Sequence, residues 1–145
     1  MKDSKQVISE ANMGKKTFSL IGIVDDDESV RESLSSLMRS VGYKTAIFSS
    51  SEAFLDSDRV SEPDCLVLDV RMPGLSGLEL QGHLHDMKCP TPIIFVTAHA
   101  DDQVRARALQ QGATAVLGKP FSDEDLLGII HSAIEVHEAS ATQIH

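Results

Sequence analysis

Five short β-prone runs recur along the chain, and each is followed by a stretch whose apolar residues repeat at helical spacing. The predicted strands span residues 18–24, 43–48, 64–69, 92–96 and 115–117. After the third strand, a predicted helix carries Leu75, Leu78, Leu80 and Leu84. A run that is apolar throughout, such as the first, indicates a strand that is covered on both faces. Alternation of such strands with helices predicts an α/β domain, in which right-handed crossovers build a parallel sheet with helices on both faces.

Charged side chains stand where three of these predicted strands end. Asp25 and Asp26 follow the first strand, Asp69 closes the third, and Lys119 follows the fifth. The carboxyl ends of parallel strands meet at one edge of an open sheet, which is where ligands bind. Carboxylates clustered with an ammonium at that edge indicate a site for a divalent cation and a phosphoryl group.

Length and charge limit the alternatives. The 145 residues are enough for one domain. The formal net charge of −9 repels phosphate backbones, so we expect no direct binding of nucleic acid by this chain. No apolar stretch approaches the length of a membrane span, and the N-terminus lacks the apolar core of a signal peptide. With Cys65 and Cys89 interpreted as reduced thiols, we expect a cytoplasmic protein.

The composition also suggests where the domain begins and ends. Residues 1–17 are polar and mixed in charge, which predicts a flexible N-terminal tail. Residues 18–138 form the predicted domain, and residues 139–145 are expected to be a C-terminal tail or a linker stub. Asp27 and Glu28 are interpreted as capping and surface charges at the start of a helix.

Four motifs follow one another at domain-like spacing: IVDDDESVRESL, LVLDVRMPGLSGLEL, PIIFVTAHAD and GKPF. Together they resemble the receiver domain of two-component response regulators, and their sequences are most similar to those of FixJ-type receivers. The resemblance covers roughly residues 18–138. It implies a flavodoxin-like (βα)5 fold, a doubly wound parallel five-stranded sheet with the strand order 2-1-3-4-5.

The resemblance assigns Asp69 as the phosphoacceptor, with a phosphohistidine on a sensor histidine kinase as the donor. It implies that Asp26 and Asp69 bind Mg²⁺ directly and that Asp25 binds it through water. The backbone carbonyl of Arg71 is implied as a further ligand. The residue types suit this chemistry, because a cation must neutralise a carboxylate and an anionic phosphoryl group before they can react. Without metal, the three carboxylates are expected to raise one another's pKa values.

The resemblance also gives roles to the ends of the fourth and fifth strands. The hydroxyl of Thr97 is implied to bond a phosphoryl oxygen and to signal the new charge, and the small Ala98 leaves access to it. Lys119 is implied to pair with a phosphoryl oxygen, oriented by a cis bond to Pro120. Taken alone, each residue has an ordinary alternative: Thr97 as a strand residue, Lys119 as a surface charge, and Asp69 as a turn residue.

Two loop positions and one strand position bear on regulation. Arg71 and His99 lie two residues after Asp69 and Thr97, where family members tune hydrolysis of the acyl phosphate; exposed loop residues are the alternative. The sequence departs from the family at Val116, where most receivers place Tyr or Phe. The usual aromatic signal is then missing, and another part of the face formed by the fourth and fifth predicted helices and the strand between them must report the state.

The expected function is a signalling switch rather than an enzyme, with limited self-phosphorylation from small phosphodonors and with self-dephosphorylation. The expected partners are a sensor histidine kinase, an output domain or protein on that face, and a second copy of the chain after phosphorylation. FixJ-type proteins usually continue into a DNA-binding domain. The chain is therefore interpreted as a stand-alone regulator or as the receiver part of a transcription regulator.

Two other functional classes share part of this set of residues. A phosphorylation-independent pseudo-receiver would be a protein-interaction module; Val116 favours it slightly, whereas the complete set of acids with Thr97 and Lys119 argues against it. A haloacid-dehalogenase-like phosphatase also uses an aspartyl nucleophile. Such an enzyme needs a second Asp two residues after the first, and this chain has Arg71 there.

Two further groups of residues give little support for a nucleotide site or a histidine metal site. Gly74 and Gly77 are not followed by the Lys-Ser or Lys-Thr pair of a nucleotide-binding P-loop. His83 and His85 lie two residues apart on a predicted helix, so they do not face each other and are interpreted as surface residues rather than metal ligands.

Overall fold

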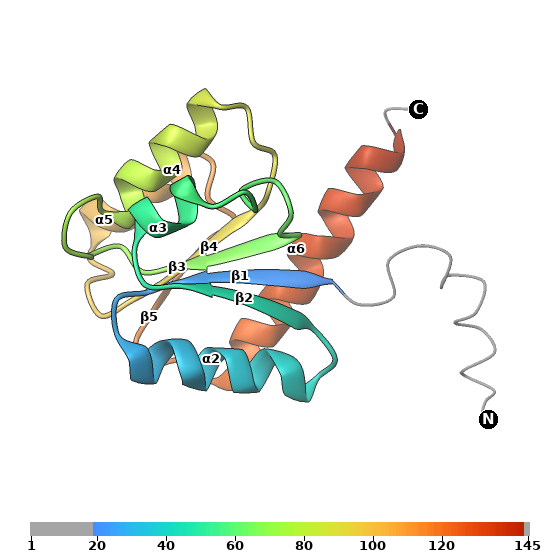
Figure 1. The fold of residues 1–145 in the computed structure, drawn as a ribbon, viewed down its shortest axis with the longest axis horizontal. Helices are drawn as coiled ribbons and strands as arrows, with labels where there is room; N and C mark the ends of the chain where they lie inside the picture. Colours follow the sequence, from blue (N-terminus) through green and yellow to red (C-terminus); the bar gives the residue numbers. More distant parts are fainter. Residues whose placement is uncertain (1–18, 144–145) are drawn as a thin grey trace.

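A computed structural model describes residues 19–143, with residues 140–143 described by their backbone alone. Within this range strands and helices alternate. The elements are β1 (Leu20–Val24), α2 (Glu28–Ser40), β2 (Lys44–Phe48), α3 (Ser51–Asp56), β3 (Cys65–Leu68), α4 (Gly77–Asp86), β4 (Ile93–Thr97), α5 (Asp102–Gln110), β5 (Ala115–Gly118) and α6 (Asp123–Gln143). All paired strands are parallel and lie in the order β2-β1-β3-β4-β5, which confirms the predicted fold (Figure 1).

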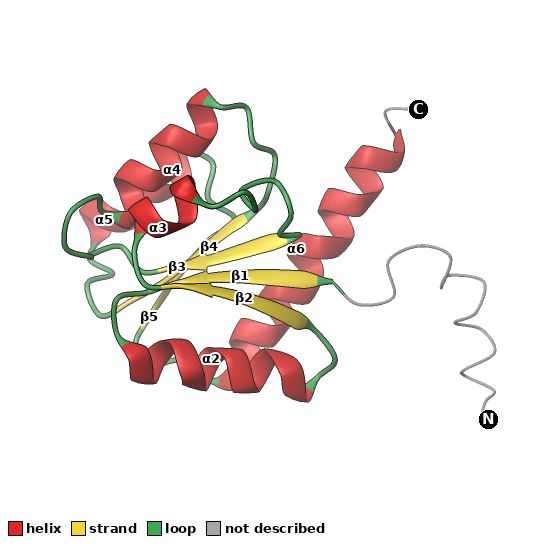
Figure 2. Cartoon of the chain, viewed as in Figure 1, coloured by secondary structure: helices red, strands yellow, loops and turns green. Residues whose placement is uncertain are grey.

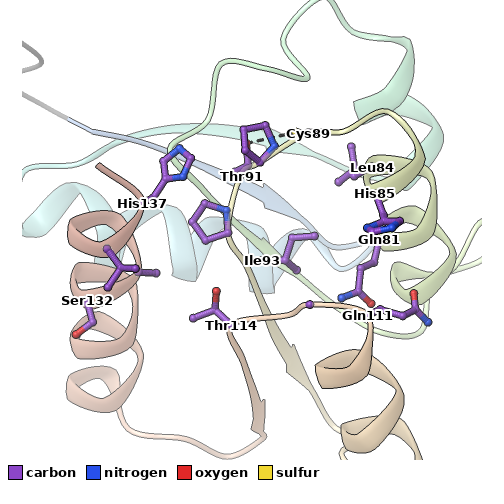
Figure 3. Close-up of a pocket in the computed structure, with 15 residues that line it drawn as sticks. Gln81, Leu84, His85, Cys89, Thr91, Ile93, Gln111, Thr114, Ser132 and His137 are labelled. Atoms are coloured by element: carbon purple, nitrogen blue, oxygen red, sulfur yellow. Dashed lines mark hydrogen bonds between the residues drawn. The ribbon is translucent and has the colours of Figure 1, made fainter. Parts of the chain in front are cut away.

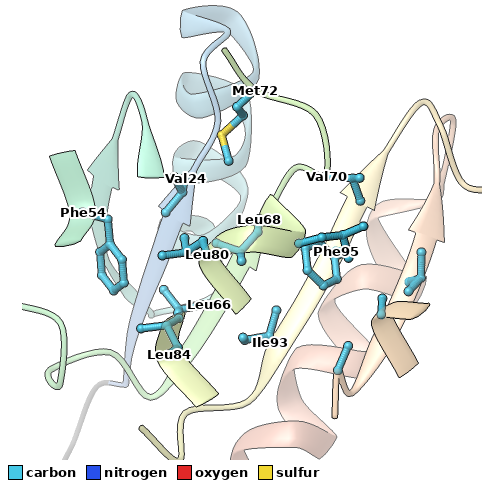
Figure 4. Packing of buried hydrophobic residues seen from close by; sticks show 14 residues of the cluster. Val24, Phe54, Leu66, Leu68, Val70, Met72, Leu80, Leu84, Ile93 and Phe95 are labelled. Atoms are coloured by element: carbon cyan, nitrogen blue, oxygen red, sulfur yellow. The ribbon is translucent and has the colours of Figure 1, made fainter. Parts of the chain in front are cut away.

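Helices cover both faces of the sheet, with α3, α4 and α5 on one face and α2 and α6 on the other (Figure 2). Successive strand residues point to opposite faces, so the central strands contribute to both layers of the core. The layer under α3, α4 and α5 includes Val24, Phe54, Leu66, Leu68, Leu80, Leu84 and Phe95 (Figure 4). The layer under α2 and α6 includes Ile21, Ile23, Leu34, Met38, Val67, Ile94, Leu126 and Ile130. Burial on both faces explains the continuous apolar runs.

The start of α2 carries the capping and surface charges predicted for Asp27 and Glu28. Asp27 is the N-cap residue, and its side chain accepts a hydrogen bond from the backbone N–H of Ser29 at 2.8 Å. Glu28 follows in the first turn, where the helix dipole favours an acidic residue. On α4, His83 and His85 are both exposed, which confirms their interpretation as surface residues.

The start of α4 differs from the prediction, which placed Leu75 in this helix. The helix begins at Gly77, and Ser76 is its N-cap residue. The N–H of Glu79 donates to Oγ of Ser76 at 3.1 Å, and the N–H of Ser76 donates to Oε1 of Glu79 at 2.9 Å. This capping box satisfies two backbone donors at once, and it sets the helix start later than apolar spacing suggested.

The third strand is also shorter than the predicted range 64–69. The side chain of Asp64 accepts a hydrogen bond from the N–H of Leu20 at 2.8 Å, just before β3 begins. At the other end, Asp69 lies directly beyond the last strand residue, Leu68.

The described elements reach beyond the predicted end of the domain. The last helix, α6, continues to Gln143, past the boundary predicted at residue 138. The predicted tail, residues 1–17, and Phe18 at the predicted start of the first strand lie outside the described residues. The division of the chain into a domain and two tails stays a prediction. No helix in residues 19–143 is both long enough and apolar enough to cross a membrane.

Both cysteines are free thiols. Cys65 lies in β3 and is fully buried, and this burial raises the pKa of its thiol to about 12. The thiol therefore stays un-ionised and acts as a small packing group.

Candidate functional site

The carboxyl ends of β1 and β3 bring three carboxylates together. Asp25 and Asp26 directly follow β1, and Asp69 directly follows β3, which is a neighbour of β1 in the sheet. One carboxylate oxygen from each of the three lies within 4.8 Å of the others. Strand pairing fixes this approach, because the N–H of Asp69 donates to the carbonyl of Val24 at 3.2 Å. The structure therefore assembles the predicted acidic cluster.

Asp25 is the most buried member of the cluster, with 1% of its surface exposed. Its Oδ1 accepts a hydrogen bond from the N–H of Asp27 at 2.9 Å, whereas its Oδ2 has no hydrogen-bond partner among the described residues. Burial raises the pKa of Asp25, the N–H of Asp27 opposes this rise, and the charge of Asp69 adds to it. The expected repulsion between carboxylates acts on Asp25, but desolvation is the larger cause.

Lys119 faces two of the carboxylates. It directly follows β5, and its Nζ lies 3.9 Å from Oδ2 of Asp25 and 3.9 Å from Oδ2 of Asp69. The peptide bond between Lys119 and Pro120 is cis, as the resemblance implied. At 3.9 Å these contacts are ion pairs rather than hydrogen bonds, so the N–H donors can still bind a further anionic group.

Thr97 ends β4 beside this cluster and is fully buried. Its Oγ1 accepts a hydrogen bond from the N–H of His99 at 3.0 Å, and its carbonyl accepts one from the N–H of Lys119 at 2.8 Å. A hydroxyl that accepts in this way can still donate its own proton. Ala98 and His99 are exposed, so the loop after β4 is open to solvent.

Arg71 and Val116 lie in different surroundings. Arg71 is exposed, and its backbone N–H donates to Oδ1 of Asp69 at 3.3 Å. Val116 is buried in the layer under α5, away from the carboxylate cluster, and belongs to the same apolar cluster as Ala108. The guanidinium of Arg105, on α5, donates to the carbonyl of Val116 at 2.6 Å. The structure thus brings Arg71 to the cluster and keeps Val116 on the α5–β5 face.

Two residues near the site were missed by the sequence analysis. A Cβ atom on Gly77 would overlap the backbone carbonyl oxygen of Asp69, so only glycine lets the start of α4 approach that residue. The guanidinium of Arg31, on α2, donates to the carbonyl of Asp25 at 2.8 Å. Gly77 falls inside the predicted helix, where a glycine is unfavourable, and this could have marked the position; no sequence signal points to Arg31.

The donor set suits a divalent cation. All three side chains offer carboxylate oxygens, which are the ligands that Mg²⁺ prefers. The buried Oδ2 of Asp25 has no hydrogen-bond partner in the described part of the chain and only the ion pair with Lys119 at 3.9 Å, so a cation would compensate its charge further. The residues present therefore fit an Mg²⁺ ion.

A groove of about 590 Å³ lies at the opposite end of the sheet, near the starts of β4 and β5. Figure 3 shows Gln81 and Leu84 of α4 facing Ser132 and His137 of α6 across it. None of the clustered carboxylates, Thr97 or Lys119 lines this groove. This groove and the clustered carboxylates are therefore at different ends of the domain.

A parallel sheet in this order, with clustered carboxylates, a lysine and a threonine at its carboxyl edge, defines a class of phosphate-handling signalling domain. Residues 21–131 match the family profile of the response regulator receiver domain, and the chain belongs to that family. It is a receiver domain of two-component signalling systems.

Individual relatives place the chain near the FixJ-type branch. It is 46% identical over 118 residues to the response regulator protein TmoT of Ectopseudomonas mendocina, covering 81% of this chain and 54% of TmoT. It is 40% identical over 121 residues to the transcriptional regulatory protein FixJ of Bradyrhizobium diazoefficiens, covering 83% of this chain and 59% of FixJ. The crystal structure of FixJ-N superposes with a TM-score of 0.74 at 37% identity, covering 81% and 94% of the two chains. The chain spans little more than half the length of these curated relatives.

Proposed function

We propose that the chain is a phosphoacceptor switch in which Asp69 takes a phosphoryl group from a phosphohistidine of a sensor kinase. The observation that carries this proposal is the placement of Asp69 between an acidic cluster and a cation. Its carboxylate lies within 4.8 Å of oxygens from Asp25 and Asp26, and 3.9 Å from the ammonium of Lys119. This is the arrangement that phosphoryl transfer to a carboxylate needs.

Asp26 and Asp69 would hold Mg²⁺ directly, Asp25 would hold it through water, and the backbone carbonyl of Arg71 would complete the protein ligands. When bound, the ion supplies positive charge that neutralises the carboxylates and the incoming phosphoryl oxygens. The burial of Asp25 supports its part in this set, because a buried carboxylate gains more from a cation than an exposed one does.

In the transfer step, a carboxylate oxygen of Asp69 forms a bond to phosphorus as the phosphorus–nitrogen bond of the donor breaks, and the electron pair returns to the imidazole. The ammonium of Lys119 and the hydroxyl of Thr97 would bind the phosphoryl oxygens, since both have donors available. In the reverse switch, water attacks phosphorus, the bond to Asp69 breaks, and inorganic phosphate leaves. Arg71 and His99 would control that attack, because both are exposed beside the site.

The change of state would be read by a protein partner on the α5–β5–α6 face. Val116 lacks the aromatic ring usual in the family, so the contact of Arg105 with the carbonyl of Val116 is a candidate for the local link between α5 and β5. The partners we infer are a sensor histidine kinase, an output domain or protein, and a second copy of the phosphorylated chain. A cytoplasmic location fits these partners, and the net charge of −9 argues against direct binding of nucleic acid.

Intact-mass spectrometry after incubation with acetyl phosphate and Mg²⁺ tests the proposal. We expect one added phosphoryl group, which is absent from Asp69→Asn and absent when a chelator removes Mg²⁺. Asp86→Asn, an exposed aspartate at the end of α4, is the charge-matched control and should be phosphorylated like the unaltered chain. A folded sample that gains no phosphoryl group from acetyl phosphate or from a phosphorylated kinase would favour the pseudo-receiver instead.

A further inference from the structure

The loop between β3 and α4, residues 70–76, borders the proposed phosphorylation site because it carries Arg71. At its start, the N–H of Arg71 donates to Oδ1 of Asp69 at 3.3 Å. At its end, the N–H of Gly77 donates to the carbonyl of Val70 at 2.9 Å. Val70 and Met72 are buried in the core layer under α3, α4 and α5, so packing positions the first half of the loop.

Glu52 ties this loop to a different part of the fold. It lies in the first turn of α3, 23 residues before Leu75 in the sequence. Its Oε2 accepts a hydrogen bond from the backbone N–H of Leu75 at 2.8 Å. The same oxygen lies beside Gly74, where a Cβ atom would stand 2.5 Å away from it. Gly74 has a φ of +77°, so glycine there serves both the turn and the close approach of the carboxylate.

The helix that carries Glu52 is itself firmly anchored. Phe54 is fully buried in the layer under α3, α4 and α5, and its ring meets that of Phe48 edge to face with centroids 5.1 Å apart. Ser50 caps the helix by accepting a hydrogen bond from the N–H of Ala53 at 3.0 Å. The carboxylate of Glu52 is therefore held on a short element whose position the core determines.

We propose that Glu52 is a positioning residue for the phosphorylation site, because its carboxylate fixes the loop 70–76 against α3. This inference rests on the proposed function of Asp69 and Arg71. Mg²⁺ accepts only near-octahedral geometry, so a shift of the loop that moves the carbonyl of Arg71 weakens the site. The same shift moves the side chain of Arg71 and alters the access of water to the acyl phosphate.

The test compares four chains: the unaltered protein, Glu52→Ala, Glu52→Gln and Asp56→Ala. Gln keeps an oxygen acceptor for the N–H of Leu75, whereas Ala removes it. Asp56 lies at the other end of α3 and is exposed, so its replacement by Ala removes the same charge from the same helix. Three quantities are measured: hydrogen exchange at the amide of Leu75, the dissociation constant for Mg²⁺ by calorimetry, and the lifetime of the phosphorylated form.

We expect Glu52→Ala to lose protection at Leu75, to show a higher dissociation constant for Mg²⁺, and to change the phosphoryl lifetime, because the loop that carries Arg71 is less well fixed. Glu52→Gln should restore all three values toward those of the unaltered chain, and Asp56→Ala should match that chain. Equal Mg²⁺ affinity and lifetime in Glu52→Ala and the unaltered protein would overturn the inference while leaving the proposed function intact. If the unaltered chain neither binds Mg²⁺ nor accepts a phosphoryl group, the proposed function fails and this inference fails with it.

Discussion

The two ends of the parallel sheet bury different kinds of group. At the carboxyl end, Asp25 and Thr97 are buried polar residues, and Oδ2 of Asp25 has no hydrogen-bond partner within the described residues. At the amino end, a groove of about 590 Å³ is lined by apolar side chains such as Ile93 and by polar ones such as Gln81. The carboxyl end thus has buried charge and a smaller hollow of about 350 Å³ that Lys119 lines, whereas the larger groove at the amino end has no Asp, Glu, Lys or Arg in its lining.

This difference shows that the size of a hollow is a poor guide to chemistry in this domain. A buried carboxylate oxygen without a hydrogen bond costs stability even beside the ammonium of Lys119, and it persists only where the surrounding fold holds it in place. The groove has no comparable cost in stability, because exposed apolar surface is common on folded proteins. We therefore expect substitutions at the carboxyl end to change both stability and phosphorylation, and those at the amino end to change neither strongly.

The largest effect is expected from Gly77→Ala. The added methyl group overlaps the backbone oxygen of Asp69, so the start of α4 or the end of β3 must move. We expect the free energy of unfolding to fall by about 1–3 kcal/mol, which is typical of an overpacked site. Phosphorylation by acetyl phosphate should slow by about tenfold to a hundredfold, because Asp69 is displaced. Urea unfolding and intact-mass time courses measure the two effects.

Gly82→Ala is the matched control on the same helix. A Cβ atom at Gly82 meets no neighbouring side chain or other element within 4 Å. The change should stabilise the protein by about 0.5–1 kcal/mol through the better helix propensity of alanine, with phosphorylation unchanged. Similar behaviour of the two variants would show that contact with Asp69 is not what requires glycine at position 77.

An intermediate effect is expected from Asp25→Asn, which removes a buried charge but keeps an oxygen that can accept from the N–H of Asp27. The variant should bind Mg²⁺ about tenfold to a hundredfold more weakly, as loss of an outer-shell ligand does. Without metal it should be more stable than the unaltered chain, because no carboxylate has to be ionised in a buried position. Calorimetric titration measures the dissociation constant for Mg²⁺, and urea unfolding in chelator measures the stability. An unchanged dissociation constant together with an unchanged free energy of unfolding would contradict this prediction.

The pH dependence of that gain in stability has a defined sign. The pKa of Asp25 in the folded protein is raised above its ordinary value of 3.8, mainly by burial. The folded state therefore holds this proton more tightly than the unfolded chain does. The resulting stabilisation is complete below pH 3.8 and is lost as the pH rises through the raised pKa. In chelator, the advantage of Asp25→Asn should widen over that window; a constant difference would mean that Asp25 is not perturbed.

The smallest effect is expected from Val136→Asn in the groove. Val136 is 66% exposed, so the change should alter the free energy of unfolding by no more than about 0.5 kcal/mol. The rate of phosphorylation should match that of the unaltered chain. A clearly slower phosphorylation would show that the two ends of the sheet are coupled and do not act separately.

The groups at the strand ends were predictable because each is marked by its neighbours in the sequence. Asp25, Asp69 and Lys119 each follow an apolar run, and strands in a parallel sheet must end at the same edge. The sheet order came from the resemblance to receiver domains. The start of α4 was predicted wrongly, because apolar spacing does not reveal that Ser76 and Glu79 form a capping box.

Contacts between distant segments were not predictable in the same way. The contact of Glu52 with Leu75 spans 23 residues, and nothing near either residue indicates it. The overlap that excludes a side chain at Gly77 depends on how closely α4 approaches the end of β3. Likewise, the dominance of burial in raising the pKa of Asp25 follows from packing around it, whereas the sequence indicated only charge repulsion.

The sequence by itself determined the alternation of strands and helices, the double-sided burial of the sheet and the identity of the charged groups at its carboxyl edge. These features depend on local periodicity and on the direction of parallel strands, which any segment of the chain carries within itself. The tertiary structure decided which oxygen of Asp25 lacks a hydrogen bond, where Lys119 lies between two carboxylates, and how Glu52 reaches the loop after Asp69. Such distances depend on how all the layers pack together, because the interior is close-packed and each contact is set by its neighbours.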